Sequence, residues 1–87
     1  MMDIYRIKWK PSALKEFKKI ERSIIPRILG TIENLSSDPF PSGVRKLQGG
    51  EHSYRIRIGD YRIIYVVFES ERLIEIARIR HRKEVYR

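Results

Sequence analysis

The sequence predicts an α+β fold: an N-terminal strand, an antiparallel helical hairpin, then a mostly antiparallel sheet of four to five strands. Two observations predict it. Apolar residues recur at helical spacing between residues 11 and 35, and apolar and polar residues alternate between residues 54 and 80. The helices then cover one face of the sheet and leave the other at least partly open. We expect a single domain across residues 1–87, whose modest core favours an open surface groove over a large closed pocket.

The first part of the chain predicts one strand and two helices. Residues 4–9 (IYRIKW) alternate as a short strand does, and we place this strand at an edge of the sheet or beside the last strands. Pro11 opens a helix, because its missing N–H costs nothing there. The apolar stripe of this helix is Ala13, Leu14, Phe17 and Ile20. A second helix runs from about residue 23 to residue 35, with Pro26 in its first turn. Its stripe is Ile25, Ile28, Leu29, Ile32 and Leu35.

The second part of the chain predicts a loop followed by a strand meander. Residues 36–43 (SSDPFPSG) are typical of a loop, and residues 44–47 of a short strand that ends before Gly49 and Gly50. Three longer strands follow at residues 54–58, 61–69 and 72–80. Short turns join them at Gly59-Asp60 and near Ser70-Glu71.

The net charge of +8 comes from 19 Lys and Arg against 11 Asp and Glu. Such a surface attracts polyanions, so we expect an anionic partner, nucleic acid foremost. An acidic protein segment is compatible with the same surface. Heat adaptation is the other explanation of a high charge content, but heat adaptation raises both signs of charge.

The composition excludes several kinds of chemistry. The chain has no cysteine, so it has no disulfide bond, thiolate zinc site or cysteine nucleophile. It has two histidines, remote in sequence, and no clustered carboxylates, so we expect no metal and no cofactor. The charged N-terminal segment is unlike a signal peptide. The longest apolar run, residues 63–68, is far below the roughly 20 residues of a membrane span. We expect a cytoplasmic protein without a membrane partner.

Residues 54–65 (YRIRIGDYRIIY) predict a hairpin with three arginines on one face. If Gly59 and Asp60 form a two-residue turn, Arg57 faces Arg62 across the hairpin. Alternation then places Arg55 on the same face as these two. The other face, which can pack on the helices, carries Ile56, Ile58, Tyr61 and Ile63.

Arg57 opposite Arg62 is a like-charge pair, which is unfavourable unless a negative group lies between them. One interpretation is neutralisation by a carboxylate, for which Asp60 and Glu51 are the nearby residues. The other is a bound phosphate, because a planar guanidinium can donate two parallel hydrogen bonds to phosphate oxygens.

The C-terminal strand carries a second set of polar residues. Arg78 and Arg80 share one face of it, and His81 follows. Tyr86 comes six residues after Arg80. Taken alone, His81 is typical of a surface histidine and Tyr86 of an aromatic residue that packs on the sheet edge.

These motifs resemble the RelE toxins of the RelE/ParE superfamily, which are small basic mRNA endoribonucleases that act on the ribosome. The resemblance covers nearly the whole chain. It is carried by Y-R-x-R-x-G-x-Y-R-x-x-Y at residues 54–65, R-x-R-K-E-V-Y at residues 80–86 and K-L-Q-G-G at residues 46–50. It implies catalytic roles for Arg62, Arg80 and Tyr86. The family's pair of basic residues falls on Arg55 and Arg57, where lysines are better known.

That departure affects the proton transfer which the resemblance implies. Arginine does not deprotonate in a protein, so Arg55 and Arg57 can only bind phosphate and stabilise charge. We expect Arg78 and Arg82 to bind RNA phosphates as well. The base that takes the 2′-hydroxyl proton is then Tyr86, whose tyrosinate form nearby guanidiniums favour, or else His81. Arg80 is expected to stabilise the leaving group, and the product is a 2′,3′-cyclic phosphate, formed without metal or cofactor.

Two other functions stay open at this stage. A ParE-like protein shares the fold but inhibits DNA gyrase and has no ribonuclease site. The second is an inactive module that binds RNA or the ribosome. The ribonuclease reading implies the ribosome and mRNA as partners. Either toxin reading implies a cognate antitoxin, RelB-like for the ribonuclease, with an acidic or amphipathic segment that covers the basic surface.

Overall fold

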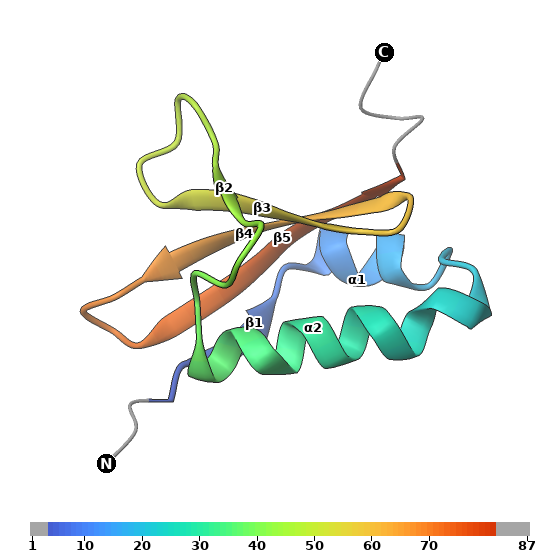
Figure 1. Ribbon diagram of the computed structural model, residues 1–87, viewed down its shortest axis with the longest axis horizontal. Coiled ribbons are helices and arrows are strands. Elements are labelled where there is room, and N and C mark those ends of the chain that lie inside the picture. Colours follow the sequence, from blue (N-terminus) through green and yellow to red (C-terminus); the bar gives the residue numbers. More distant parts are fainter. Residues whose placement is uncertain (1–3, 82–87) are drawn as a thin grey trace.

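The computed structural model describes residues 4–81 and contains two α-helices and one five-stranded sheet (Figure 1). The elements in chain order are β1 (Arg6–Trp9), α1 (Pro11–Phe17), the short 3-10 helix η1 (Arg22–Ile24), α2 (Ile25–Ser37), β2 (Arg45–Lys46), β3 (Ser53–Ile58), β4 (Tyr61–Phe68) and β5 (Leu73–His81). The strand order is β1-β5-β4-β3-β2. Only the β1–β5 pair is parallel among these strands, so the sheet is mixed. The predicted α+β fold is confirmed, with β1 at an edge and beside the last strand.

The two helices lie on the same side of the sheet. Figure 1 shows the chain turning after α1 and α2 running back beneath the strands, as expected for a helical hairpin. Pro11 opens α1 and Pro26 lies in the first turn of α2, both as predicted. Helix α1 packs mainly against β5, at the margin of the sheet, so only part of its apolar stripe is covered. Ala13 is fully buried, whereas Leu14 is 44% exposed.

The core lies between α2 and the covered face of the sheet. Residues Ile28, Ile32 and Leu35 of α2 are buried. They belong to one cluster with residues of the three long strands. The strand residues in that cluster are Ile56, Ile58, Ile63, Tyr65, Val67, Ile74, Ile76 and Ile79. The opposite face carries no helix (Figure 1), so the side chains on that face can meet a ligand.

Tyr65 brings a polar group into this core. Its side chain is fully buried, and its hydroxyl donates a 2.7 Å hydrogen bond to the carbonyl of Pro39 in the loop after α2. Burial raises the pKa of Tyr65 well above its ordinary value, and negative charge on Tyr54 or Asp38 raises it further. The Tyr65 hydroxyl therefore stays protonated in the folded protein at pH values where it ionises in the unfolded chain.

We expect Tyr65→Phe to change how stability depends on alkaline pH. Above about pH 10 the unfolded chain loses the Tyr65 proton while the folded protein keeps it, so the free energy of unfolding falls as pH rises. Tyr65→Phe removes this part of the decline, and at neutral pH it costs about 1 kcal/mol for the lost hydrogen bond. Urea unfolding at pH 7 and at pH 10.5 measures both effects. Tyr61→Phe is the control, since the Tyr61 hydroxyl accepts only a 3.5 Å contact from the Glu21 amide. The same decline in Tyr65→Phe as in the wild type would contradict the assignment.

The turn between β4 and β5 corrects one predicted boundary. The strand was expected to start at residue 72, but β5 starts at Leu73. Arg72 has φ 54°, in the left-handed region that few residues other than glycine occupy. Its carbonyl accepts a 2.9 Å hydrogen bond from the Arg6 amide, which joins this turn to the start of β1.

Candidate functional site

Within residues 4–81, six arginines gather on the open face of the sheet, and we call this set the arginine face. Its residues are Arg45, Arg55, Arg57, Arg62, Arg78 and Arg80. They come from four strands, and the strand registers arrange them in two rows. Arg57, Arg62 and Arg80 lie side by side across β3, β4 and β5, and the predicted pairing of Arg57 with Arg62 is confirmed. The second row runs from Arg45 through Arg55 and Ile64 to Arg78.

A β-bulge in β5 decides which face Arg78 and Arg80 occupy. The register pairs Tyr65 with Ile76 but Ile64 with Arg78, so Ala77 is an extra residue. Ile76 is fully buried on the helix side, and strict alternation from it would turn Arg78 and Arg80 toward the helices. The bulge reverses the alternation and places both arginines on the open face.

The arginines of β2, β3 and β4 line an open hollow. This hollow has a volume of about 310 Å³, and its lining is Gly43, Arg45, Arg55, Arg57 and Arg62. A second hollow of about 570 Å³ is lined by Arg45, Lys46, Leu47, Gln48 and Arg55. Within residues 4–81, neither lining includes Asp or Glu. The two hollows share Arg45 and Arg55 and therefore form one cationic surface. Arg45 was not among the site residues predicted from the sequence.

The hairpin turn orients one of these arginines. Arg57 Nε donates a 3.1 Å hydrogen bond to the carbonyl of Gly59. Gly59 has φ +58°, which suits the first position of a two-residue hairpin turn. This contact uses one of the five N–H groups of Arg57 and holds its guanidinium next to Arg62.

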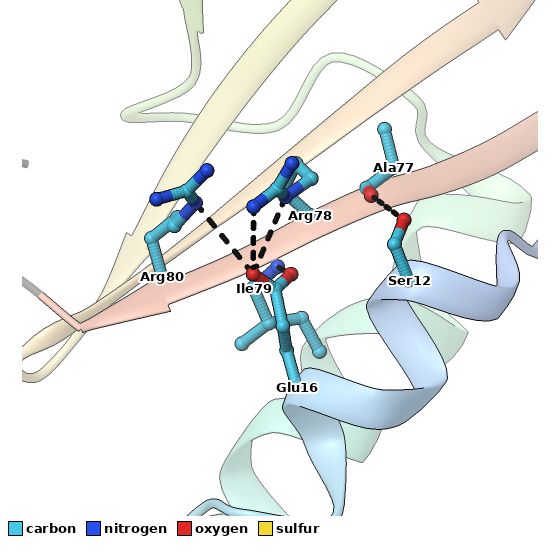
Figure 2. A network of polar contacts seen from close by, with 6 residues as sticks. All are labelled: Ser12, Glu16, Ala77, Arg78, Ile79 and Arg80. Atoms are coloured by element: carbon cyan, nitrogen blue, oxygen red, sulfur yellow. Dashed lines mark hydrogen bonds and ion pairs between the residues drawn. The ribbon is translucent and has the colours of Figure 1, made fainter. Parts of the chain in front are cut away.

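One carboxylate that contacts the arginine face is Glu16, which was not predicted from the sequence. Glu51, one of the two residues considered for neutralising the hairpin, instead lies 3.8 Å from His52. Glu16 of α1 contacts the end of β5, where Oε2 lies 3.1 Å from Arg78 Nη2 and 3.6 Å from Arg80 Nε (Figure 2). Its Oε1 accepts a 2.9 Å hydrogen bond from the Ile79 amide. The only signal in the sequence was one acidic residue among the lysines of residues 15–19.

Of the two residues considered as bases, His81 lies within the described residues. His81 pairs with Tyr61, on the helix side, and the two rings meet edge to face with centroids 5.0 Å apart. The hollow that His81 lines also contains Glu16 and Lys19 but none of the arginine face. Tyr86 and Arg82 lie outside the described residues. The assignment of a base stays a prediction, and the position of His81 favours Tyr86.

Over the described part of the chain, no three His, Asp or Glu residues come together in a way that could hold a metal ion. Among residues 4–81, the structure contains no helix with the length and apolar character needed to cross a membrane. The arginine face supplies guanidinium groups. They bind phosphate oxygens and stabilise negative charge, and they stay protonated while doing so.

The fold and the arginine face together define a small, basic α+β domain with a cationic sheet surface. The chain belongs to the ParE toxin family of type II toxin–antitoxin systems, whose model matches residues 7–86. The inferred membership of the RelE/ParE superfamily is thereby confirmed. A Methanocaldococcus jannaschii protein named as toxin RelE1 is 34% identical over 77 residues, covering 85% of this chain and 86% of that protein.

Solved structures agree with this assignment. The archaeal RelE–RelB complex from Pyrococcus horikoshii contains a chain that is 31% identical, with a TM-score of 0.81, covering 94% of this chain and 97% of that one. The RelB–RelE antitoxin–toxin complex from Methanococcus jannaschii gives 28% identity and a TM-score of 0.77, with 91% and 94% covered. The isolated Escherichia coli RelE toxin has the same fold, with a TM-score of 0.79 at 23% identity, covering 94% of this chain and 90% of that one.

Proposed function

We propose that this RelE-like toxin cleaves mRNA on the ribosome. The observation that carries the proposal is the row of Arg57, Arg62 and Arg80, which places three arginines side by side on neighbouring strands of an open face. In the proposed reaction the 2′-oxygen of a nucleotide forms a bond to the adjacent phosphorus as the P–O5′ bond breaks. The 2′-hydroxyl proton goes to a base and the 5′-oxygen gains a proton. The products are a 2′,3′-cyclic phosphate and a 5′-hydroxyl end.

We assign each arginine a role in this reaction from its position on the sheet. Arg55 and Arg57 line the open hollow and bind the RNA backbone, with Arg45 extending the surface toward β2. Arg62 lies between Arg57 and Arg80 and stabilises the charge of the phosphorane. Arg80, at the other end of the row, stabilises the leaving 5′-oxygen. We assign the base to Tyr86 in the C-terminal segment, with Arg82 as a further phosphate contact.

The open shape of the site supports a role for the ribosome. A face without a second wall can bind a phosphate but cannot by itself fix the conformation of a flexible strand. Catalysis needs the attacking and leaving oxygens held in line, so a second surface that orders the mRNA strengthens the reaction. The translating ribosome is such a surface, and it places the protein in the cytoplasm.

We also propose a RelB-like antitoxin as partner. Two related toxins with 28% to 31% identity were solved as complexes with RelB proteins. An acidic segment of an antitoxin laid over the arginine face would neutralise the same guanidiniums that bind RNA. Tight co-purification with a small acidic protein, and arrested growth when the toxin is expressed alone, are the expected signs of this partner.

One observation favours a second candidate function. The matching family model carries the name of the ParE toxins, so gyrase inhibition is the alternative activity. A gyrase inhibitor acts by binding and has no need for a row of guanidiniums that meets a scissile phosphate.

A direct assay separates the two functions. Translating ribosomes are incubated with the protein, and mRNA ends are mapped and tested for 2′,3′-cyclic phosphate. DNA supercoiling by gyrase is measured in parallel. We expect cuts within codons on the ribosome, fewer cuts in the same mRNA without ribosomes, and unchanged supercoiling. Intact mRNA together with inhibited supercoiling would replace the ribonuclease with the ParE-like function.

A further inference from the structure

Glu16 joins helix α1 to both arginines at the end of β5. Its Oε1 accepts a hydrogen bond from the Ile79 amide, and its Oε2 forms ion pairs with the guanidiniums of Arg78 and Arg80 (Figure 2). The Glu16 side chain is only 21% exposed, so its charge is partly shielded from water. A carboxylate in this position is firmly held, because Arg78 and the Ile79 amide donate hydrogen bonds to it and Arg80 adds an ion pair.

The contacts of Glu16 with the two arginines are unequal. Arg78 directs both Nε and Nη2 to the same oxygen, at 3.3 Å and 3.1 Å. Arg80 approaches that oxygen only with Nε, at 3.6 Å. Arg78 is therefore engaged in holding Glu16 in place, whereas the contact of Arg80 with Glu16 does not use the two terminal nitrogens of Arg80.

Contacts between the start of α1 and β5 hold Glu16 in its position. The Lys10 amide donates a 3.0 Å hydrogen bond to the Ile76 carbonyl, and Ser12 Oγ lies 3.4 Å from the Ala77 carbonyl. Helix α1 is thus attached to β5 at the bulge, one turn before Glu16. The bulge turns Arg80 to the open face, and Glu16 holds its guanidinium there.

We propose that Glu16 is a positioning residue for Arg80, which it orients toward the scissile phosphate through their ion pair. The inference rests on the proposed ribonuclease function. Glu16 does not touch RNA in this assignment. The negative charge of Glu16 weakens RNA binding, whereas its ion pair with Arg80 favours the chemical step. Its effect on binding and its effect on the cleavage rate can therefore be measured separately.

Glu16→Gln tests the proposal with little change of shape. The glutamine oxygen still accepts the Ile79 amide, but the side chain no longer carries the charge that attracts Arg80. We expect the single-turnover cleavage rate on ribosomes to fall about 10- to 100-fold, since small displacements of a catalytic group have effects of this size. We expect the KM for ribosomes to stay equal or fall, because the net charge rises by one. Glu16→Asp, which keeps the charge but is shorter, should give an intermediate rate.

Glu33→Gln is the matched control. Glu33 is exposed on α2, on the helix side of the sheet, and its change to Gln alters the net charge equally. Its cleavage rate should equal that of the wild type. The Arg80 Nε–H signal in NMR spectra should shift in Glu16→Gln and stay in place in Glu33→Gln. This second readout reports the ion pair without cleavage.

A double substitution shows whether Glu16 acts through Arg80. In an Arg80→Lys background the further change Glu16→Gln should lower the rate much less than it does in the wild type. A Glu16→Gln protein that cleaves as fast as Glu33→Gln, or an equal loss in both backgrounds, would overturn the proposal. Wild-type protein that leaves mRNA intact in the same assay would instead overturn the ribonuclease function.

Discussion

Replacing Arg80 with alanine is expected to lower the rate of mRNA cleavage on the ribosome by about 100- to 1,000-fold, the usual effect of removing one preorganised donor to a developing charge. Arg80 lies beside Arg62 on the open face and presents its guanidinium at the end of the three-arginine row. Arg62→Ala should cause a loss of similar size, because Arg62 is the middle member of that row. Neither change removes a residue of the core.

Single-turnover cleavage with excess toxin measures these rates over several orders of magnitude. Arg22→Ala is the matched control, because Arg22 is exposed in η1 on the helical side and its loss changes the net charge equally. Circular dichroism of each variant checks that the domain is folded. Full cleavage by folded Arg62→Ala and Arg80→Ala proteins would refute the site assignment, even if the ribonuclease activity itself were confirmed.

The second large effect is on stability. Ile63→Ala is expected to lower the free energy of unfolding by about 2 to 5 kcal/mol, through lost burial and the cavity left behind. Ile63 is fully buried, and in the sheet it lies between Ile56 of β3 and Ile79 of β5. A small domain has a total stability of about 5 to 15 kcal/mol, so this one change removes a large part of it.

Ile64 is the natural control for this substitution. It is the next residue of β4, has the same side chain and lies half-buried on the open face between Arg55 and Arg78. Ile64→Ala should cost clearly less, because its side chain has less surface to lose. Urea unfolding of both variants gives the comparison. Equal losses for the two isoleucines would mean that the helix side is not the main core.

The hairpin was the part of the site most open to prediction from the sequence. Its register follows from a two-residue Gly59-Asp60 turn and from the alternation on both sides of it, and the structure confirms each predicted pair. This inference uses a local pattern that strand geometry fixes directly. The first strand was predicted at an edge of the sheet or beside the last strands, and β1 lies at an edge and beside β5.

The rest of the site depends on features that were not predicted from the sequence. The apolar residues of β5 change phase between Ile76 and Ile79. This change of phase accompanies the bulge that turns Arg78 and Arg80 to the open face, but the pattern does not show which residue is the extra one. Glu16 is separated from Arg78 by 62 positions, and its contact exists only because α1 lies against the edge of β5. Helix α1 itself ends at Phe17, so the predicted stripe extended past its end to Ile20.

The pairing of β1 with β5 has a consequence for the time at which the toxin becomes active. The first strand of the described chain finds its sheet partner in the last one, and Arg6 pairs with Leu73. A nascent chain that has not yet emerged through β5 lacks this partner, and it also lacks Arg80. Contacts between residues so far apart in sequence form slowly, because a long loop must close first. We therefore expect the native sheet and the cleavage site to form together, after translation of β5, which gives an antitoxin made in the same cell an interval in which to bind.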